Sequence, residues 1–481
     1  MQIRDSSEDA ISPTLEFPLH AGYRKPSGVG LMRSDGAPIE VTGPAAEVVA
    51  RCLPSFRDFV DIALFDPRCG YYSTGQVRFG YGGHYDTFPL ALAPMFGRML
   101  EQYAFRFWRR AGRPPRFEIC ELGAGNGQLC LDVLITVLDR ARREPAWSRF
   151  AKSFRYRIIE RSPALIARQR EQLGPLARRV RWTQADLAQA ARRRAPLAAC
   201  GVVFANEVLD CLSHHKIVSR YDKTPGVVFV APRLAQGAPG TEKLQRVARV
   251  DWAGQALSGR ALPAVLADAQ RRPALRFEEI VLPLTVVPGL QEFLQRHYPE
   301  FFAGQRFRPY FACPAIETLV GAAARLYDAC DLLWIDYGDM REFHLGTPAS
   351  RRVFAGPPRS GASVYRAPGL DDITFLVDFS VVDETARRAG LRVRYYGPQS
   401  ELARRSGVRL DAEAVELIVQ YRALGWMLAL VGADAEREWR HTGLTWGPGQ
   451  RRVRLRDDAK RAVAEFLGRR RSHFKLMIMS A

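Results

Sequence analysis

The sequence carries its strongest structural signal in FEICELGAGNGQ, residues Phe117–Gln128. The first six residues form a short, mostly apolar run that is typical of a buried strand, and three glycines then interrupt regular structure. Apolar residues recur at helical spacing from Gln128 to Leu138. A strand, a glycine-rich turn and a helix in this order predict a Rossmann-like α/β unit, in which backbone N–H groups at the start of the helix face a polar or anionic ligand group.

Strand and helix signals continue to alternate along the chain. Short apolar runs predict five more strands, at Tyr156–Glu160, Val180–Asp186, Gly201–Asn206, Leu332–Tyr337 and Leu391–Tyr396. Helical patterns separate several of them, as at Pro163–Leu173 and Asp378–Gly390. This alternation is typical of an α/β fold in which helices cover both faces of a mostly parallel sheet.

The domain organisation follows from where this alternation begins and where it is interrupted. Residues 1–50 are rich in Ser, Pro and Gly and lack periodicity, so we expect a loosely ordered N-terminal extension. Residues 51–481 are expected to form one catalytic domain with two insertions. The first insertion, at about 221–311, contains many prolines and is expected to shape a substrate cleft. The second spans about 410–467.

Composition excludes several classes of protein. No apolar run reaches the roughly 18 residues of a membrane helix and the start lacks a secretory signal, so we expect no membrane insertion and a cytoplasmic location. The eight cysteines form no Cys-x-x-Cys pair and no zinc-ligand grouping, so no metal is expected. The net charge of +19 comes from scattered arginines without interleaved aromatic residues, so no specific nucleic-acid partner is expected. The oligomeric state stays open.

The glycine loop favours an S-adenosyl-L-methionine site over a nicotinamide dinucleotide site. The dinucleotide fingerprint requires a glycine at position 128, where this chain has Gln, and a ribose-binding acid about 20 residues further on. Here the next strand-end acid is Glu160, which lies much further along the chain. We therefore expect the cofactor to be S-adenosyl-L-methionine, bound at Glu121, Gly123, Ala124, Gly125 and Gly127.

Polar residues at the ends of three further strands complete the candidate site. Glu160 suits a free ribose diol, and Asp186 with the backbone amide of Leu187 can meet an adenine ring, although Asp186 can also be read as a helix N-cap. Parallel sheets bind ligands at the carboxyl ends of their strands. For this reason we expect the polar side chains after the fourth strand to face the substrate, with structural capping as the alternative; they are Asn206, Glu207 and Asp210.

Seven motifs in order resemble the MidA-like family, the bacterial and mitochondrial relatives of a respiratory complex I assembly factor that is a protein arginine methyltransferase. The resemblance covers about residues 54–407 and a short segment at Phe474-Lys-Leu. The motifs are Phe65-Asp-Pro-Arg-Cys-Gly-Tyr-Tyr72, Gly83-His-Tyr-Asp-Thr-Phe-Pro89, Glu121-Leu-Gly-Ala-Gly-Asn-Gly127, Ile159-Glu-Arg-Ser-Pro163, Asn206-Glu-Val-Leu-Asp-Cys-Leu212, Asp336-Tyr-Gly338 and Pro368-Gly-Leu-Asp-Asp-Ile-Thr374 with Val377-Asp-Phe379.

The resemblance implies a class I methyltransferase fold, a Rossmann-like, seven-stranded, mostly parallel sheet with helices on both faces and insertions. In that fold the seventh strand runs antiparallel beside the sixth, and Phe474–Met479 is the best candidate for it. The resemblance also implies a cofactor site that uses Gly83, Gly123, Gly125, Glu160 and Asp186, and an acceptor side formed by Asn206, Glu207 and Asp210.

Several residues depart from the family pattern. His84 and Tyr85 follow Gly83 where the family has Asp-Phe, and Leu90 follows Pro89 where an acid is usual. Ala124 replaces a Pro, and Leu209 replaces a Phe. A histidine that the family has between Asp336 and Pro368 is absent near Gly356-Pro-Pro-Arg-Ser-Gly361. These departures cluster on the acceptor side and leave the identity of the methyl acceptor open.

Three functions are compatible with these residues. The first is an enzyme that methylates a protein arginine or a similar nitrogen acceptor, because carboxylates such as Glu207 and Asp210 can orient a guanidinium. The second is a small-molecule O- or N-methyltransferase of a biosynthetic pathway. The third is a non-catalytic assembly factor that retains an S-adenosyl-L-methionine site.

Overall fold

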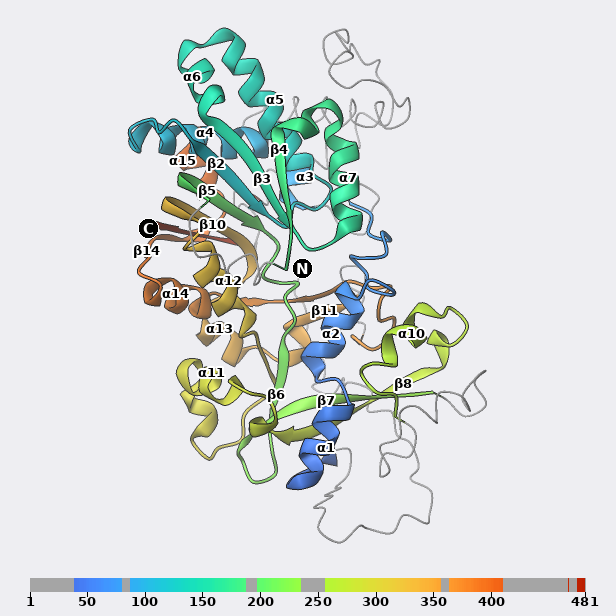
Figure 1. Ribbon diagram of the computed structural model, residues 1–481. Helices are drawn as coiled ribbons and strands as arrows, with labels where there is room; N and C mark the ends of the chain where they lie inside the picture. Colours follow the sequence, from blue (N-terminus) through green and yellow to red (C-terminus); the bar gives the residue numbers. More distant parts are fainter. Residues whose placement is uncertain are drawn as a thin grey trace, which may run out of the picture. The chain divides into compact units, whose positions relative to one another are not determined.

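Most of the strands that the sequence predicts belong to one large sheet (Figure 1). The computed structural model describes residues 39–79, 87–186, 197–234, 256–355, 363–409, 466 and 474–480. The chain divides into two compact units, each made of three segments. We call residues 75–211, 315–341 and 376–481 the Rossmann-like unit, and residues 1–74, 212–314 and 342–375 the accessory unit.

The sheet of the Rossmann-like unit has the strand order β14-β15-β10-β5-β2-β3-β4. Neighbouring strands are parallel except for β15, which runs antiparallel to both β10 and β14. A two-residue strand, β13, extends the parallel pairing at the end of β10. The seven-stranded, mostly parallel sheet predicted from the sequence is therefore confirmed. The bounds are β2 Phe117–Leu122, β3 Phe154–Glu160, β4 Val180–Gln184, β5 Ala198–Asn206, β10 Tyr327–Asp339, β13 Val377–Asp378, β14 Arg392–Pro398 and β15 Phe474–Ser480.

Helices cover both faces of this sheet. All six residues of β2 are buried, which requires cover on both sides. Among the described residues no helix is long and apolar enough to cross a membrane. The helices of this unit are α3 Phe88–Ala91, α4 Met95–Arg110, α5 Gln128–Arg143, α6 Pro145–Ser153, α7 Pro163–Leu173, α12 Ala315–Ala323, α14 Phe379–Arg388 and α15 Glu401–Ser406, with a 3₁₀ turn at Gly174–Arg179.

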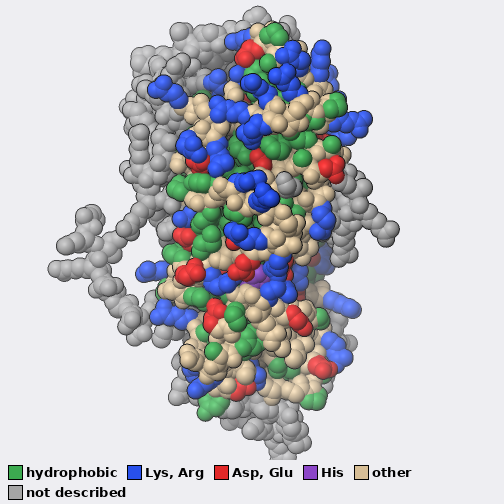
Figure 2. Space-filling view, turned by 90° about the vertical axis from the view of Figure 1, so that its left-hand side faces the viewer, with side chains coloured by type: hydrophobic (Ala, Val, Ile, Leu, Met, Phe, Trp, Pro, Cys, Tyr) green, Lys and Arg blue, Asp and Glu red, His purple; other side chains and the backbone are tan. Residues whose placement is uncertain are grey.

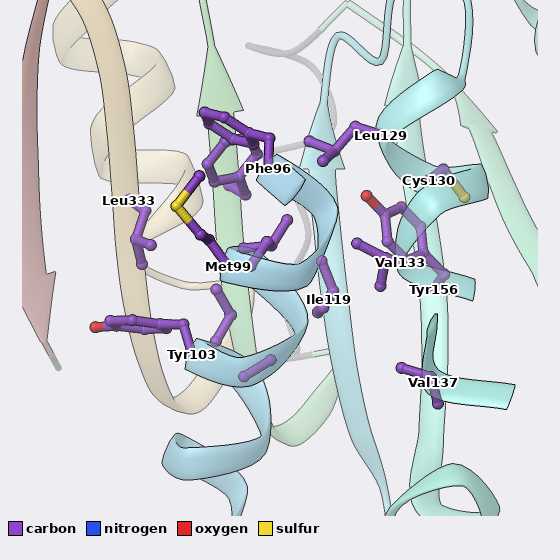
Figure 3. Close-up of a cluster of buried hydrophobic side chains, with 14 of the residues drawn as sticks. Phe96, Met99, Tyr103, Ile119, Leu129, Cys130, Val133, Val137, Tyr156 and Leu333 are labelled. Carbon is purple, nitrogen blue, oxygen red and sulfur yellow. The ribbon is translucent and has the colours of Figure 1, made fainter. Parts of the chain in front are cut away.

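The main hydrophobic core lies between the sheet and helices α4 and α5 (Figure 3). Phe96 and Met99 of α4 and Val133 of α5 are fully buried there against Ile119 of β2. Leu333 of β10 belongs to the same cluster, whereas its buried neighbours on the strand, Leu332 and Trp334, do not. Successive residues of this strand therefore point to opposite faces of the sheet. Helices α12 and α14 pack against each other outside this cluster.

The accessory unit is built on a second sheet of order β1-β8-β7-β6-β9. Helix α2 packs on β6 and β7, where Ser55 forms a bridge to Phe229, and α1 packs on β8. Its elements are β1 Ile39–Glu40, α1 Pro44–Cys52, α2 Phe56–Phe65, β6 His215–Ser219, β7 Pro225–Leu234, α10 Leu262–Ala267, β8 Leu275–Pro283, α11 Leu290–His297, β9 Tyr310–Ala312, β11 Val353–Ala355 and β12 Ile373–Phe375. Helix α13, Arg341–Gly346, begins at the boundary, and 3₁₀ turns occupy Arg272–Ala274, Leu284–Val286, Pro299–Phe302 and Ala349–Arg351.

The structure corrects the expected domain boundaries. Residues 39–50 are not a loose extension, because β1 pairs with β8 and the side chains of Val41 and Val49 are fully buried. The segment expected to be an insertion at 221–311 joins residues before 75 in a unit with its own sheet. The sequence analysis missed β7 because the strand contains Pro225 and Pro232, and proline is rare inside strands. Residues 1–38 and the expected insertion at 410–467, apart from Phe466, lie outside the described residues.

The C-terminal strand β15 is inserted between two other strands of the sheet. It pairs along seven residues with β10 and along six with β14. Four consecutive side chains, Leu476, Met477, Ile478 and Met479, are fully buried. This position confirms the predicted seventh strand, and it shows that β10 and β14 are joined through β15.

Removal of residues 474–481 should prevent the Rossmann-like unit from folding. Each buried side chain of this size stabilises a protein by about 1.5–3 kcal/mol, so four of them rival a typical total stability of about 5–15 kcal/mol. Expression of the truncated chain should give insoluble protein, as measured by the soluble fraction and circular dichroism. The substitution Ser480→Ala, which removes only the 2.6 Å hydrogen bond to Asp331, serves as a control and should cost about 1 kcal/mol. A truncated protein with an unchanged melting temperature would contradict this role of β15.

Candidate functional site

The glycine loop leaves β2 through three residues with positive φ. The φ angles of Gly123, Gly125 and Gly127 are 63°, 54° and 85°, a region that side-chain-bearing residues rarely adopt. A Cβ atom on Gly125 would lie 3.3 Å from the ring of Phe79, and one on Gly127 would lie 3.2 Å from the backbone of Gln169. The loop is therefore compact where α5 begins. The backbone N–H groups of Gly123 and Gly127 donate to the carbonyls of Ile159 and Ala124, and the N–H of Gln128 donates to the side chain of Asn126.

Two buried carboxylates lie beside this loop. Glu121, on β2, accepts a 2.7 Å hydrogen bond from the hydroxyl of Tyr156. Burial raises the pKa of Glu121 to about 7, and the neighbouring charges of Glu160 and Asp132 act in the same direction. Glu160, at the end of β3, accepts hydrogen bonds from the backbone N–H of Ser162 and from the amide of Gln169. Burial raises the pKa of Glu160 to about 6 despite these donors.

Gln169 ties the loop to these acids, and the sequence analysis missed it. Its amide nitrogen donates to the carbonyl of Gly125 at 3.0 Å and to Glu160 at 3.2 Å, while its amide oxygen accepts from the indole of Trp182. The side chain is fully buried. It lies within α7 with no motif around it, so only the fold could reveal its contact with a loop more than forty residues away.

The remaining predicted cofactor residues have different outcomes. Ala124 is buried in the loop. Asp186 follows β4 and is partly exposed, with Arg161 at 3.7 Å, so it lies at the same edge of the sheet as Glu160. Gly83 and Leu187 lie outside the described residues.

The polar residues after β5 form a compact segment, Asn206–Asp210, that we call the acceptor-side segment. The amide nitrogen of Asn206 donates to Glu207 at 2.9 Å, and its amide oxygen is buried without a hydrogen-bond partner among the described residues. Glu207 has a φ of 51°, which is unusual for a residue with a side chain. Asp210 is buried and accepts a short hydrogen bond from the hydroxyl of Tyr337, and its burial raises its pKa to about 6.

The acceptor-side segment touches the glycine loop. A Cβ atom on Gly123 would lie only 3.0 Å from a methyl group of Val208, which occupies the middle of the segment. Both elements lie at the carboxyl edge of the sheet, because β2 and β5 are parallel neighbours. The structure thus brings together within one unit the loop, the two buried glutamates and the segment that the sequence assigned to the acceptor.

The polar groups of this site fit S-adenosyl-L-methionine. The loop backbone at Gly125 is left-handed, at a position where a side chain would meet Phe79, and the carboxylate of Glu160 is buried at the same edge of the sheet. The unpaired oxygen of Asn206 is a buried acceptor that needs an N–H or O–H donor. These residues would hold the cofactor and a second polar molecule at one edge of the sheet.

Comparison with protein families decides the identification. Residues 99–397 match the model of the family described as "Putative S-adenosyl-L-methionine-dependent methyltransferase". The chain belongs to this family. The match covers β2 to β14, including the glycine loop and the acceptor-side segment, and it confirms the resemblance to MidA-like methyltransferases.

Two curated relatives match shorter stretches of this methyltransferase-family protein. The mitochondrial protein arginine methyltransferase NDUFAF7 homolog of Drosophila melanogaster is 31% identical over 112 residues, which is 23% of each chain. The mitochondrial protein arginine methyltransferase NDUFAF7 of Danio rerio is 31% identical over 90 residues, 19% of this chain and 21% of that protein. The chain therefore matches less than a quarter of the length of these relatives.

A solved structure shows the same fold over nearly the whole chain. It is a protein from Burkholderia thailandensis bound to S-adenosyl-homocysteine, with a TM-score of 0.54 and 20% sequence identity. The alignment covers 91% of this chain and 94% of the other. The class I methyltransferase fold expected from the sequence is confirmed.

Substitution Gly125→Val should abolish S-adenosyl-L-methionine binding. A branched side chain cannot adopt a φ of 54° without strain and would collide with Phe79. Calorimetric titration should show a loss of affinity of at least about a hundredfold, equal to about 2.7 kcal/mol. Gly112→Val is the matched control, because Gly112 also has a positive φ of 80° but nothing lies within 4 Å of its Cβ position. Equal affinities of the two folded variants would refute the loop assignment.

The predicted role of Glu160 as ribose ligand gives a pH dependence. The charged carboxylate accepts hydroxyl hydrogen bonds, and protonation removes acceptor capacity. Because the pKa of Glu160 is raised to about 6, affinity for S-adenosyl-L-methionine should be full above pH 7 and should fall as the pH drops through 6. Titrations between pH 5 and 8 measure this decrease, and Glu160→Gln should weaken binding at pH 7.5 and flatten the profile. An unchanged profile in that variant would assign the pH dependence to another group.

Proposed function

We propose that this protein transfers a methyl group from S-adenosyl-L-methionine to a nitrogen acceptor, most specifically to the guanidinium of a protein arginine. The observation that carries the proposal is the acidic acceptor-side segment directly against the glycine loop. Glu207 and Asp210 lie in that segment, and a guanidinium is always protonated and offers five N–H donors to such carboxylates.

The chain's own residues would orient the acceptor. The carboxylates of Glu207 and Asp210 would hold the positive charge, and the unpaired oxygen of Asn206 would accept an N–H of the nitrogen that reacts. Bound S-adenosyl-L-methionine supplies a methyl group on a positively charged sulfur. The cofactor would give up this methyl group to the acceptor nitrogen and keep the electrons of the C–S bond, and a carboxylate of the segment would take the proton that the nitrogen loses. Catalysis then rests on proximity and alignment.

The proposed cofactor residues are those that the loop and its neighbouring strands place at one edge. They are Glu121, Gly123, Ala124, Gly125, Gly127, Glu160 and Asp186. The relatives named protein arginine methyltransferase support the acceptor class, and the Burkholderia structure with bound S-adenosyl-homocysteine supports the cofactor.

Substitution Glu207→Gln should separate acceptor binding from cofactor binding. The amide keeps the shape of the side chain but removes the charge that orients a cation. Affinity for S-adenosyl-L-methionine should stay within threefold, while methyl transfer to arginine-containing peptides should fall about 10- to 100-fold, as expected for the loss of about 1.5–3 kcal/mol from a charge-assisted hydrogen bond. Glu171→Gln, at an exposed position of α7, removes a charge in the same unit and should leave both quantities unchanged.

The acceptor class decides how the Glu207→Gln variant behaves. With a neutral hydroxyl acceptor the same change should reduce turnover less than threefold, which would favour the small-molecule function. A wild-type protein that binds S-adenosyl-L-methionine but labels no acceptor in a cell lysate would favour the non-catalytic assembly factor.

A further inference from the structure

Strand β10 contacts the acceptor-side segment through three consecutive residues. The carbonyl of Ile335 accepts the backbone N–H of Glu207 at 2.8 Å. One oxygen of the Asp336 carboxylate accepts the backbone N–H groups of Val208, Leu209 and Asp210, at 3.2, 2.9 and 3.2 Å. The hydroxyl of Tyr337 donates to the side chain of Asp210. Every backbone N–H from residue 207 to residue 210 is therefore bonded to β10.

The Asp336 carboxylate replaces the partners that a regular strand would supply. The last β5–β10 pair joins Asn206 to Ile335, and the chain then turns away with Glu207 at a φ of 51°. Three successive N–H groups pointing at one oxygen form an anion-binding concavity, which is normally filled by a phosphate or a carboxylate from elsewhere. Here a buried side chain of the next strand fills it, and its second oxygen accepts the N–H of Tyr337 at 2.8 Å.

The conformation of Glu207 and Asp210 depends on this contact. A left-handed residue with a side chain persists only where its surroundings determine it. Burial raises the pKa of Asp336, and the nearby charges of Asp210 and Glu207 raise it further. Asp336 stays buried among these acids because four backbone N–H groups donate to its carboxyl group. A hydrophobic side chain at this position would leave the four donors buried and unpaired.

We propose that Asp336 and Tyr337 are positioning residues for the methyl acceptor: Asp336 fixes the backbone of the acceptor-side segment, and Tyr337 fixes the carboxylate of Asp210. This proposal rests on the proposed function for its effect on turnover, but its effect on the segment itself is independent of any acceptor. The hydrogen bonds described above join both residues to the acceptor-side segment, so cofactor binding should be little affected.

The other end of β10 provides a matched control. Asp331 is buried on the same strand and accepts a 2.7 Å hydrogen bond from the hydroxyl of Tyr103 and a 2.6 Å hydrogen bond from Ser480. It thus forms a buried Asp–Tyr pair at the amino edge of the sheet, away from the carboxyl edge where the loop and the segment lie. Loss of this pair removes equivalent hydrogen bonds without touching the acceptor-side segment.

The experiment compares Asp336→Ala and Tyr337→Phe with Asp331→Ala and Tyr103→Phe. Amide hydrogen exchange followed by mass spectrometry should show at least tenfold faster exchange in peptides that contain residues 207–210 of Asp336→Ala, with no change in peptides that contain the glycine loop. Affinity for S-adenosyl-L-methionine should stay within threefold in both β10 site variants. In methylation of an arginine-containing acceptor, kcat should fall at least tenfold for Asp336→Ala and at least threefold for Tyr337→Phe. Both control variants should melt at lower temperature but keep wild-type kcat and wild-type exchange at 207–210.

Different results overturn different claims. Unchanged exchange at 207–210 in Asp336→Ala, or equal losses of kcat in the control variants, would overturn the positioning role. If Asp336→Ala does not fold, Tyr337→Phe decides the matter through kcat relative to Tyr103→Phe. Absence of nitrogen methylation by the wild-type protein would overturn the proposed function alone, since the exchange measurement needs no acceptor.

Discussion

Parallel pairing of β2 with both β3 and β5 is the constraint on which the rest of the molecule depends. It forces the carboxyl ends of these strands to one edge of the sheet, so that the residues following each strand meet although they are far apart in the chain. The glycine loop, Glu160 and the acceptor-side segment all follow directly from these strand ends. The chain leaves β2 through the left-handed glycines of the loop, and it leaves β5 through Glu207, which also has a positive φ.

The same edge concentrates negative charge in a chain whose net charge is +19. Glu121, Glu160, Asp210 and Asp336 are all buried there. Burial raises the pKa values of all four, with values of about 7, 6 and 6 for Glu121, Glu160 and Asp210. Among the described residues, no lysine or arginine forms an ion pair with these four acids. Burial of an unpaired acid is costly, and this cost is tolerated mainly at functional sites. A cationic acceptor and a cationic sulfonium cofactor would both relieve it.

The sequence predicted the Rossmann-like sheet well because local signals agreed with each other. The apolar run at Phe117–Leu122 and the helix Pro163–Leu173 have the same bounds in the structure. The distant strand at Phe474 was predicted because the fold implied by the family resemblance requires a seventh strand. The accessory unit was missed because its strand β7 contains prolines and its segments come from three separate parts of the chain. The acids at strand ends could be predicted from their positions in the sequence. The contacts of Gln169 and the hydrogen bonds of Asp336 could not, because they join distant parts of the chain and leave no periodic pattern in the sequence.

The central claim is that this edge of the sheet joins S-adenosyl-L-methionine to a nitrogen acceptor. The most direct measurement is incubation of the purified protein with S-adenosyl-L-methionine that carries a deuterated methyl group and with a lysate, followed by fragmentation mass spectrometry of the labelled products. The account predicts that the deuterated methyl group is found on a guanidinium nitrogen of a protein arginine. A label found on hydroxyl or carboxyl oxygens, with none on nitrogen, would contradict it.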